Sequence, residues 1–286
     1  MSLWHVVILA IVQGLTELLP VSSSAHVVVA EKLLGLDPSS PPMTLLLVML
    51  HTGTMFAVIV YFWRQWRETY FQSVPAFKKF AGLVVVATIL TGLVGEAIIK
   101  IIEKTVFRGL PHAEIEDLFR HLELIAPALA VAGILILIAG ISDRRNPAGK
   151  TNDLNAKQAE IIGTVQGLCL PFRGFSRSGA TISAGMLAGV AKPRAETFSF
   201  ALAVVLTPPV VAREAIRLVR AEHITGTASL ASAAFPSLLG AVFAFLAGLV
   251  ALKWLSRWLA HGHWHFFGIY CLAAAAAVGY LHYLGY

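Results

Sequence analysis

The sequence predicts an all-α polytopic membrane protein, with six transmembrane helices and two re-entrant helix–loop–helix hairpins in an inverted repeat. Three observations carry this prediction. The 286-residue chain is 57% hydrophobic and only 13% charged, whereas soluble domains have about 25% charged residues. Apolar stretches of the length that crosses a bilayer, about 20 residues, recur along the chain. Two further apolar regions are interrupted by polar tips. We therefore expect a single integral membrane domain over residues 1–286.

The first interrupted region covers residues 4–34 and is broken by the tip Pro20-Val21-Ser22-Ser23-Ser24. Neither half is long enough to cross a bilayer. Irregular backbone at membrane depth is tolerated only where protein or a water-filled cavity covers it. This pattern predicts a re-entrant hairpin over 4–34.

Uninterrupted apolar stretches follow this hairpin. They predict transmembrane helices at 43–63, 80–102, 124–141, 197–212, 234–252 and 264–284. The first three of these helices separate the first interrupted region from the second.

The second interrupted region covers residues 158–190 and repeats the first. The tetrapeptide that begins at Val12, VQGL, recurs at Val165, and in both copies a proline and a serine-containing tip follow. Three crossings lie between the copies, so the second hairpin enters from the opposite face. We predict inverted repeats over about 4–66 and 158–220, an arrangement that places a site near the bilayer midplane.

Charge and cysteine content exclude several classes of protein. The net charge is +6, but membrane proteins place excess Lys and Arg in cytoplasmic loops and near lipid headgroups, so we expect membrane lipids and no nucleic acid as partners. Twelve Lys and Arg residues fall in the loops of one face and eight in those of the other. The richer face is expected to be cytoplasmic, with both termini outside. Cys169 and Cys271 lie in apolar stretches, which argues against a disulfide or a zinc site.

The first tip combines polar side chains with a helix start. Gln13 and Glu17 are four residues apart and share one helix face just before the break at Pro20. Beyond the break, the serines at 22–24 are of the type that caps a helix, and His26 lies one turn into that helix. A helix N-terminus of this kind attracts anions.

The second tip repeats this device. Gly174 and Gly179 allow close backbone approach, Ser176 and Ser178 supply caps and hydroxyl donors, and Arg177 adds a forked cation suited to phosphate oxygens. Thr181 follows one turn later. Two helix N-termini that meet from opposite faces predict a pocket for a phosphate or a diphosphate.

Other interpretations of these residues remain open at this point. A Glu17–Arg177 ion pair could only hold the hairpins together, and the serines could only be caps. His26 could be a packed histidine. His51 and Glu96 lie inside predicted helices, and the sequence leaves open whether each lines the cavity. The cluster His261, His263 and His265 is interpreted as an interfacial loop rather than a metal site, because no carboxylate lies nearby in the sequence.

At these residues the sequence resembles the bacterial undecaprenyl-diphosphate phosphatase family of the bacitracin-resistance type. The resemblance rests on QGLTELLPVSSSAH from Gln13 to His26 and on GFSRSGATIS from Gly174 to Ser183, and the hydrophobic pattern is similar over nearly the whole chain. It implies an inner-membrane enzyme that removes one phosphate from undecaprenyl diphosphate, with a periplasmic active site, a required divalent cation and bacitracin resistance. Two positions depart from the family pattern: Gln13 replaces an acidic residue, and Arg173 stands where many members have proline.

The resemblance and the residues together suggest roles. We expect Arg177, Ser176, Thr181 and the backbone of the second tip to hold the phosphates. Gln13, Ser22, Gly174 and Ser178 complete the expected substrate-binding set.

The catalytic set is expected to be Glu17, Ser23, His26 and Arg177. Glu17 is expected to bind Mg²⁺ or Ca²⁺, because both prefer hard oxygen ligands. Ser23 is the expected nucleophile with His26 as its base, and direct attack by His26 is the alternative.

A rival hypothesis is a transporter or flippase for an anionic or polyprenyl-phosphate substrate, since inverted repeats with broken helices are common in transporters. The polyprenyl tail of the substrate is expected to lie against the membrane helices. A homodimer is compatible with the sequence.

Overall fold

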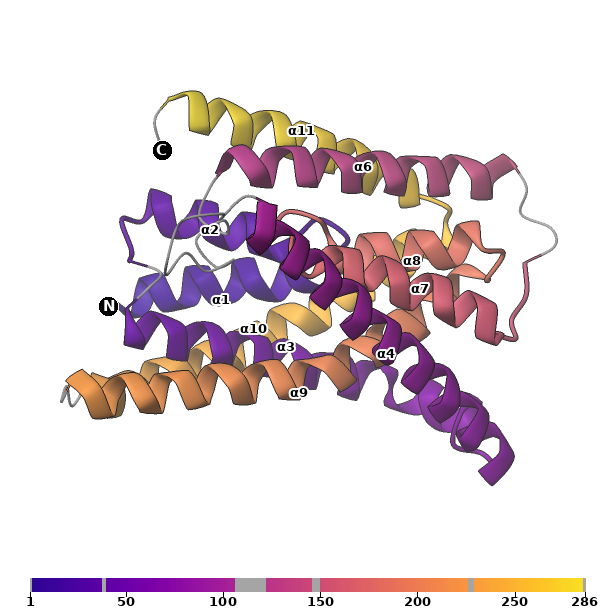
Figure 1. The fold of residues 1–286 in the computed structure, drawn as a ribbon, viewed down its shortest axis with the longest axis horizontal. Helices are drawn as coiled ribbons and strands as arrows, with labels where there is room; N and C mark the ends of the chain where they lie inside the picture. The colour runs from indigo at the N-terminus through magenta and orange to yellow at the C-terminus, as the bar shows by residue number, and fades with distance from the viewer. Residues whose placement is uncertain (1, 38–39, 106–121, 146–149, 226–228, 285–286) are drawn as a thin grey trace.

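The computed structural model describes residues 2–37, 40–105, 122–145, 150–225 and 229–284, and over these residues the secondary structure is α-helical with no strand. Figure 1 shows the arrangement. The helices are α1 (Leu3–Leu18), α2 (Ser23–Leu33), α3 (Pro41–Thr69), α4 (Val74–Thr105), α6 (Leu122–Arg145), α7 (Ala156–Cys169), α8 (Arg177–Leu187), α9 (Lys192–Thr225), α10 (Ser229–Ala260) and α11 (Trp264–Tyr283).

Six of these helices are long and apolar enough to cross a membrane, which confirms the six predicted segments. The candidate spans are Pro42–Thr69, Val74–Thr105, Leu124–Arg145, Lys192–Arg213, Ala234–Ala260 and Trp264–Tyr283. Most extend beyond the predicted limits, because a helix continues through polar residues where its backbone hydrogen bonds persist. At the end of α3, for example, Arg64 and Glu68 form an i,i+4 ion pair at 2.8 Å. The loop residues Arg108 and Arg120, used in the charge count, lie outside the described residues.

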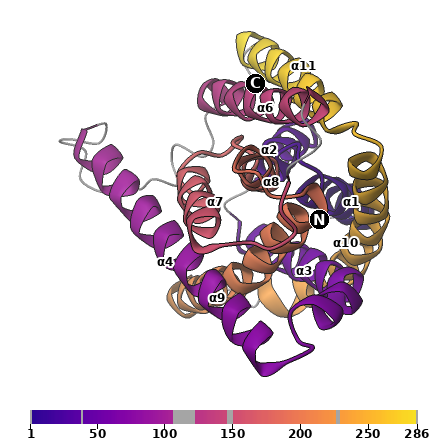
Figure 2. The ribbon, with the colours of Figure 1, turned by 90° about the vertical axis from the view of Figure 1, so that its right-hand side faces the viewer.

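The remaining four helices form two short pairs, α1 with α2 and α7 with α8, that coincide with the interrupted apolar regions. Helix α1 ends before Leu19, whose backbone is extended, and α2 begins after Ser22, which has φ +66°. Helix α7 begins with a capping box formed by Asn155 and Gln158. In Figure 2 the four short helices lie inside a ring of the six long ones.

Large aromatic side chains are buried in the core that the helices share. Trp264, Phe62, Phe198 and Phe200 are almost fully buried. Trp264 at the start of α11 donates its indole N–H to Ser183 Oγ of α8 at 3.0 Å. This hydrogen bond joins the long helix α11 to the short pair α7–α8. Glu96 of α4 does not take part in this interior, because its side chain is 62% exposed and pairs with Lys100 at 3.2 Å.

Candidate active site

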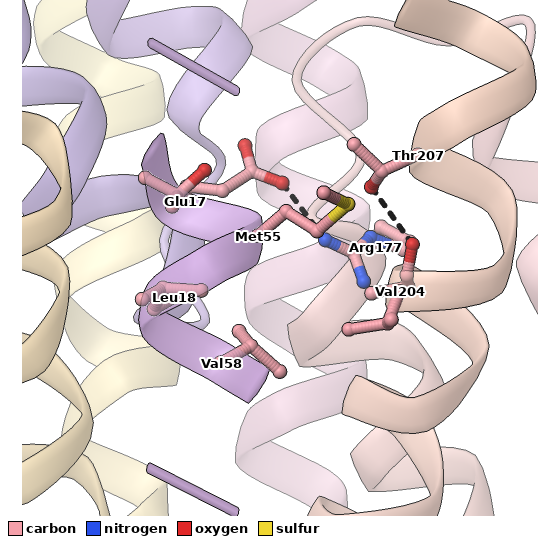
Figure 3. Close-up of a pocket in the computed structure, with 9 residues that line it drawn as sticks. Glu17, Leu18, Met55, Val58, Arg177, Val204 and Thr207 are labelled. Carbon is pink, nitrogen blue, oxygen red and sulfur yellow. Dashed lines mark hydrogen bonds and ion pairs between the residues drawn. The ribbon is translucent and has the colours of Figure 1, made fainter. Parts of the chain in front are cut away.

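The two interrupted regions meet through an ion pair between residues 160 positions apart. Glu17, in the last turn of α1, accepts a hydrogen bond on Oε1 from Nη2 of Arg177, the first residue of α8, at 2.8 Å. Figure 3 shows this contact. The two side chains are only 16% and 23% exposed. A charge-assisted pair in such a sheltered place orients both groups.

The other carboxylate oxygen of Glu17 collects three further polar groups. Ser23 Oγ donates to Glu17 Oε2 at 2.5 Å, and Gln13 Nε2 donates to the same oxygen at 3.2 Å. His51 of α3 places Nε2 at 3.9 Å from it. The structure thus brings Gln13, Ser23 and Arg177 together around Glu17, and it adds His51, whose place in the cavity the sequence left undecided.

The turn before α8 is shaped by glycine and serine. Ser176 caps α8 by accepting a hydrogen bond from the Gly179 N–H at 3.2 Å, as expected. Gly174 has φ +98°, and a Cβ there would lie 2.5 Å from the carbonyl oxygen of Ile125 in α6. No other residue type fits this turn without a shift of backbone. The close approach is to protein backbone in α6.

Hydrogen bonds tie the two turns to each other as well. The Gly174 N–H donates to Ser24 Oγ at 3.3 Å, and Ser178 Oγ donates to the Leu19 carbonyl at 3.2 Å. Arg173 adds an electrostatic interaction with Glu31, a buried residue of α2. The turns therefore form one connected unit.

Two residues expected at the substrate lie in other settings. Thr181 has no exposed surface, and its hydroxyl contacts the Arg177 carbonyl at 2.8 Å and Ser199 Oγ of α9 at 2.6 Å. Ser22 stands at the N-cap position of α2, but its side chain does not cap the helix; its Oγ lies 3.3 Å from Ser24 Oγ.

The ring nitrogens of His26 contact groups other than the Ser23 hydroxyl. Its Nδ1 contacts the Ser22 carbonyl at 2.7 Å and its Nε2 contacts the hydroxyl of Tyr270 in α11, also at 2.7 Å. The His26 and Tyr270 rings are stacked, with centroids 5.7 Å apart. Both ring nitrogens thus have partners other than Ser23. Tyr270 carried no signal in the sequence, because it lies 244 residues from His26 inside an apolar stretch.

A pocket opens beside the ion pair. Glu17 and Arg177 line it, together with Leu18 of α1, Thr54, Met55 and Val58 of α3, and Ala203, Val204 and Thr207 of α9. In Figure 3 the Arg177 guanidinium lies between Glu17 and Met55 on one side and Val204 and Thr207 on the other. Nη1 of Arg177 is buried and has no hydrogen-bond partner among the described residues. The pocket therefore places this cationic donor among both polar and apolar side chains.

The arrangement supports phosphate chemistry. It provides a hydroxyl bonded to a carboxylate, a guanidinium with a free donor, and the N-terminus of α8 at the same place, which favours anions. Among the described residues there is no group of three or more His, Cys, Asp or Glu side chains that could hold a metal ion.

Fold and site together describe a polytopic α-helical membrane protein in which two short helix pairs meet at the Glu17–Arg177 ion pair. The family model of bacitracin resistance protein BacA matches residues 6–277 of this chain. The chain belongs to this family, which confirms the resemblance found in its two motifs.

Individual relatives are similar to this chain over nearly its full length. Undecaprenyl-diphosphatase 2 of Acinetobacter baylyi is 57% identical over 281 residues, covering 97% of both chains. Undecaprenyl-diphosphatase 2 of Burkholderia thailandensis is 35% identical over 285 residues, covering 96% of this chain and 95% of the relative. Undecaprenyl-diphosphatase 1 of Burkholderia pseudomallei is 34% identical with the same coverage.

Proposed function

We propose that this protein is a membrane enzyme that hydrolyses undecaprenyl diphosphate to undecaprenyl phosphate and inorganic phosphate. The observation that carries the proposal is the contact of the Ser23 hydroxyl with Glu17, 2.5 Å long, beside Arg177. The family and the names of the relatives point to the same reaction. Hydrolysis regenerates the monophosphate carrier lipid of cell-wall synthesis and removes the diphosphate form that bacitracin sequesters.

The geometry supports a two-step mechanism. Ser23 Oγ attacks the terminal phosphorus, its proton passes to Glu17 Oε2, and the bond from phosphorus to the bridging oxygen breaks, so undecaprenyl phosphate leaves. Water then attacks phosphorylated Ser23, Glu17 returns its proton to Oγ as the bond from phosphorus to Oγ breaks, and inorganic phosphate leaves with both protons of the water. Arg177 and the N–H groups at the start of α8 stabilise the charge that develops on the phosphate oxygens. In this scheme Glu17 takes the place of His26 as the partner of the nucleophile.

Glu17 is the residue of the site that would hold a divalent cation, together with the substrate phosphates. Mg²⁺ is commonly bound by one or two carboxylates together with substrate phosphates, and Glu17 is a carboxylate beside the pocket. When bound, Mg²⁺ or Ca²⁺ supplies neutralisation of phosphate charge. Gln13 already donates its amide N–H to Glu17, which keeps that carboxylate oriented.

The proposal includes re-entrant hairpins in an inverted repeat. Helices α1, α2, α7 and α8 have 16, 11, 14 and 11 residues, too few to cross about 30 Å of hydrocarbon at 1.5 Å per residue. Gly14 of α1 packs against α10, where a Cβ would lie 2.6 Å from Ala247 Cβ, and Gly167 of α7 packs in the same way against α4, 2.8 Å from Val94 Cβ. Helices α4 and α10 are each the second long helix after a short pair, and these equivalent contacts support the proposed repeat.

The proposed orientation places the site toward the periplasm and both termini outside, from the loop charge count. A cysteine that replaces Asp37, between α2 and α3, should react with a membrane-impermeant maleimide added to intact spheroplasts. A cysteine that replaces Gln72, between α3 and α4, should react only after lysis. Cys169 and Cys271 are replaced by serine in both variants. The opposite labelling would invert the proposed topology.

A transporter or flippase is the second candidate, because broken helices in inverted repeats suit transport. The Ser23–Glu17 hydrogen bond favours an enzyme, since moving an anion needs no activated hydroxyl. The purified protein in detergent should release phosphate from undecaprenyl diphosphate, and Ser23→Ala should not. A folded wild-type protein that releases no phosphate, with or without Mg²⁺ and Ca²⁺, would overturn the proposed function.

A further inference from the structure

The backbone just before the proposed nucleophile is strained. Ser22 has φ +66°, and it is the only non-glycine residue with positive φ in the described part of the chain. An L-residue with a side chain rarely adopts this conformation, and such strain persists only where surrounding contacts determine it. Ser22 directly precedes Ser23, so its conformation decides where the Ser23 hydroxyl points.

His26 is bonded to this strained residue. Its Nδ1 lies 2.7 Å from the Ser22 carbonyl oxygen, and its backbone N–H donates to the same oxygen at 3.4 Å. A carbonyl oxygen only accepts, so Nδ1 carries the hydrogen and Nε2 of the neutral ring presents a lone pair. One carbonyl therefore receives two hydrogen bonds from His26.

Tyr270 completes the arrangement from the last helix. Its hydroxyl donates to that lone pair on His26 Nε2 at 2.7 Å, and the two rings stack at an interplanar angle of 11°. The adjacent Cys271 is fully buried and donates its Sγ–H to the Pro20 carbonyl at 3.3 Å, which anchors α11 to the same turn. Helix α11 thus holds the His26 ring, and the ring holds Ser22.

We propose that His26 and Tyr270 are positioning residues that fix the strained turn at Ser22 and so aim the Ser23 hydroxyl at Glu17. This inference rests on the proposed function, because it assigns a role in presenting the nucleophile of that reaction. It makes His26 neither the base nor the nucleophile. What the enzyme needs from His26 is the N–H donor at Nδ1.

Asparagine and glutamine separate this role from acid–base chemistry. The amide nitrogen of Asn occupies the place of His Nδ1, whereas that of Gln occupies the place of Nε2. His26→Asn therefore keeps the donor to the Ser22 carbonyl, and His26→Gln and His26→Ala lose it. We expect His26→Asn to retain kcat within about tenfold of wild type, and the other two variants to lose at least about tenfold more.

Tyr270→Phe tests the outer part of the arrangement. It removes one neutral hydrogen bond and should lower kcat by about two- to tenfold, with little change in KM. In a His26→Ala background the same change should have no further effect, because the two residues act as a unit. Tyr280→Phe, at an exposed tyrosine of the same helix, is the matched control and should leave kcat unchanged in both backgrounds.

Phosphate release from undecaprenyl diphosphate is measured over a range of substrate concentrations, with size-exclusion profiles as the check on folding. If His26→Asn is as inactive as His26→Ala while both remain folded, the imidazole itself takes part in the chemistry and the inference is wrong. Additive effects of Tyr270→Phe and His26→Ala would also overturn it. If His26→Ala misfolds, the comparison of His26→Asn with His26→Gln is sufficient to distinguish a positioning role from acid–base chemistry. Failure of the proposed function is a different result, namely an inactive wild-type protein.

Discussion

Replacement of Arg177 by Lys tests whether Arg177 binds a phosphate of the substrate or only joins the two turns through its ion pair with Glu17. The guanidinium donates Nη2 to Glu17 at 2.8 Å and keeps Nη1 free of any partner in the described structure. A Lys ammonium can keep the ion pair with Glu17, but it cannot serve a phosphate oxygen in the forked manner of Arg. The variant therefore loses the contact to substrate while the contact between the turns persists.

The size of the loss follows from that one contact. A hydrogen bond to a charged group contributes about 1.5–3 kcal/mol, and each 1.36 kcal/mol corresponds to tenfold in rate. Arg177→Lys should therefore lower kcat/KM by about 10- to 150-fold. The assay is phosphate release from undecaprenyl diphosphate in detergent, with size-exclusion profiles compared between variants.

Arg144→Lys is the matched control. Arg144 is in the last turn of α6 and contacts His265 Nε2 at 3.3 Å. Neither residue lines the pocket beside Glu17 and Arg177, so the replacement should leave kcat/KM unchanged. An Arg177→Lys variant within threefold of wild type would refute the phosphate role and leave the ion pair as a purely structural contact.

Four other variants test the site. Glu17→Gln should lower turnover by at least about 100-fold and abolish the response to added Mg²⁺ or Ca²⁺, because an amide neither takes the Ser23 proton nor binds a hard cation well; an unchanged response would place the cation elsewhere. Ser23→Ala should remove nearly all phosphate release, whereas His26→Ala should retain a measurable residue of it; the reverse order would favour His26 as nucleophile. Replacing all three histidines of the turn at 261–265 by Gln should change activity by less than about twofold, since surface substitutions away from a site have small effects, and a large loss would make that turn part of the site.

The transmembrane helices were predictable because hydrophobicity alone decides which segments can lie in lipid. Their ends were not, since polar ends are stabilised by local contacts such as the Arg64–Glu68 pair. Helix α9 continues through Pro208 and Pro209 to Thr225, well past the predicted 212. A proline pair ordinarily argues for a break.

The two turns of the site were also predictable, because the Ser, Gly and Pro residues that interrupt an apolar run must be covered by protein or water. The partners within the site were harder to predict. Glu17 and Gln13 share a helix face, which spacing reveals, but the contact of His26 with Tyr270 depends on how α11 packs against α2. Sequence proximity suggested His26 as the base of Ser23, whereas the bond that forms joins Ser23 to Glu17.

The most direct test of the account is to trap the phosphorylated enzyme. The protein is mixed with undecaprenyl diphosphate labelled in its terminal phosphate, quenched within milliseconds, and digested to locate the label. Attack by Ser23, with Glu17 as proton acceptor, predicts an acid-stable phosphoserine at position 23 that is absent from Ser23→Ala. Acid-labile label on His26, with Ser23→Ala still forming it, would contradict the account.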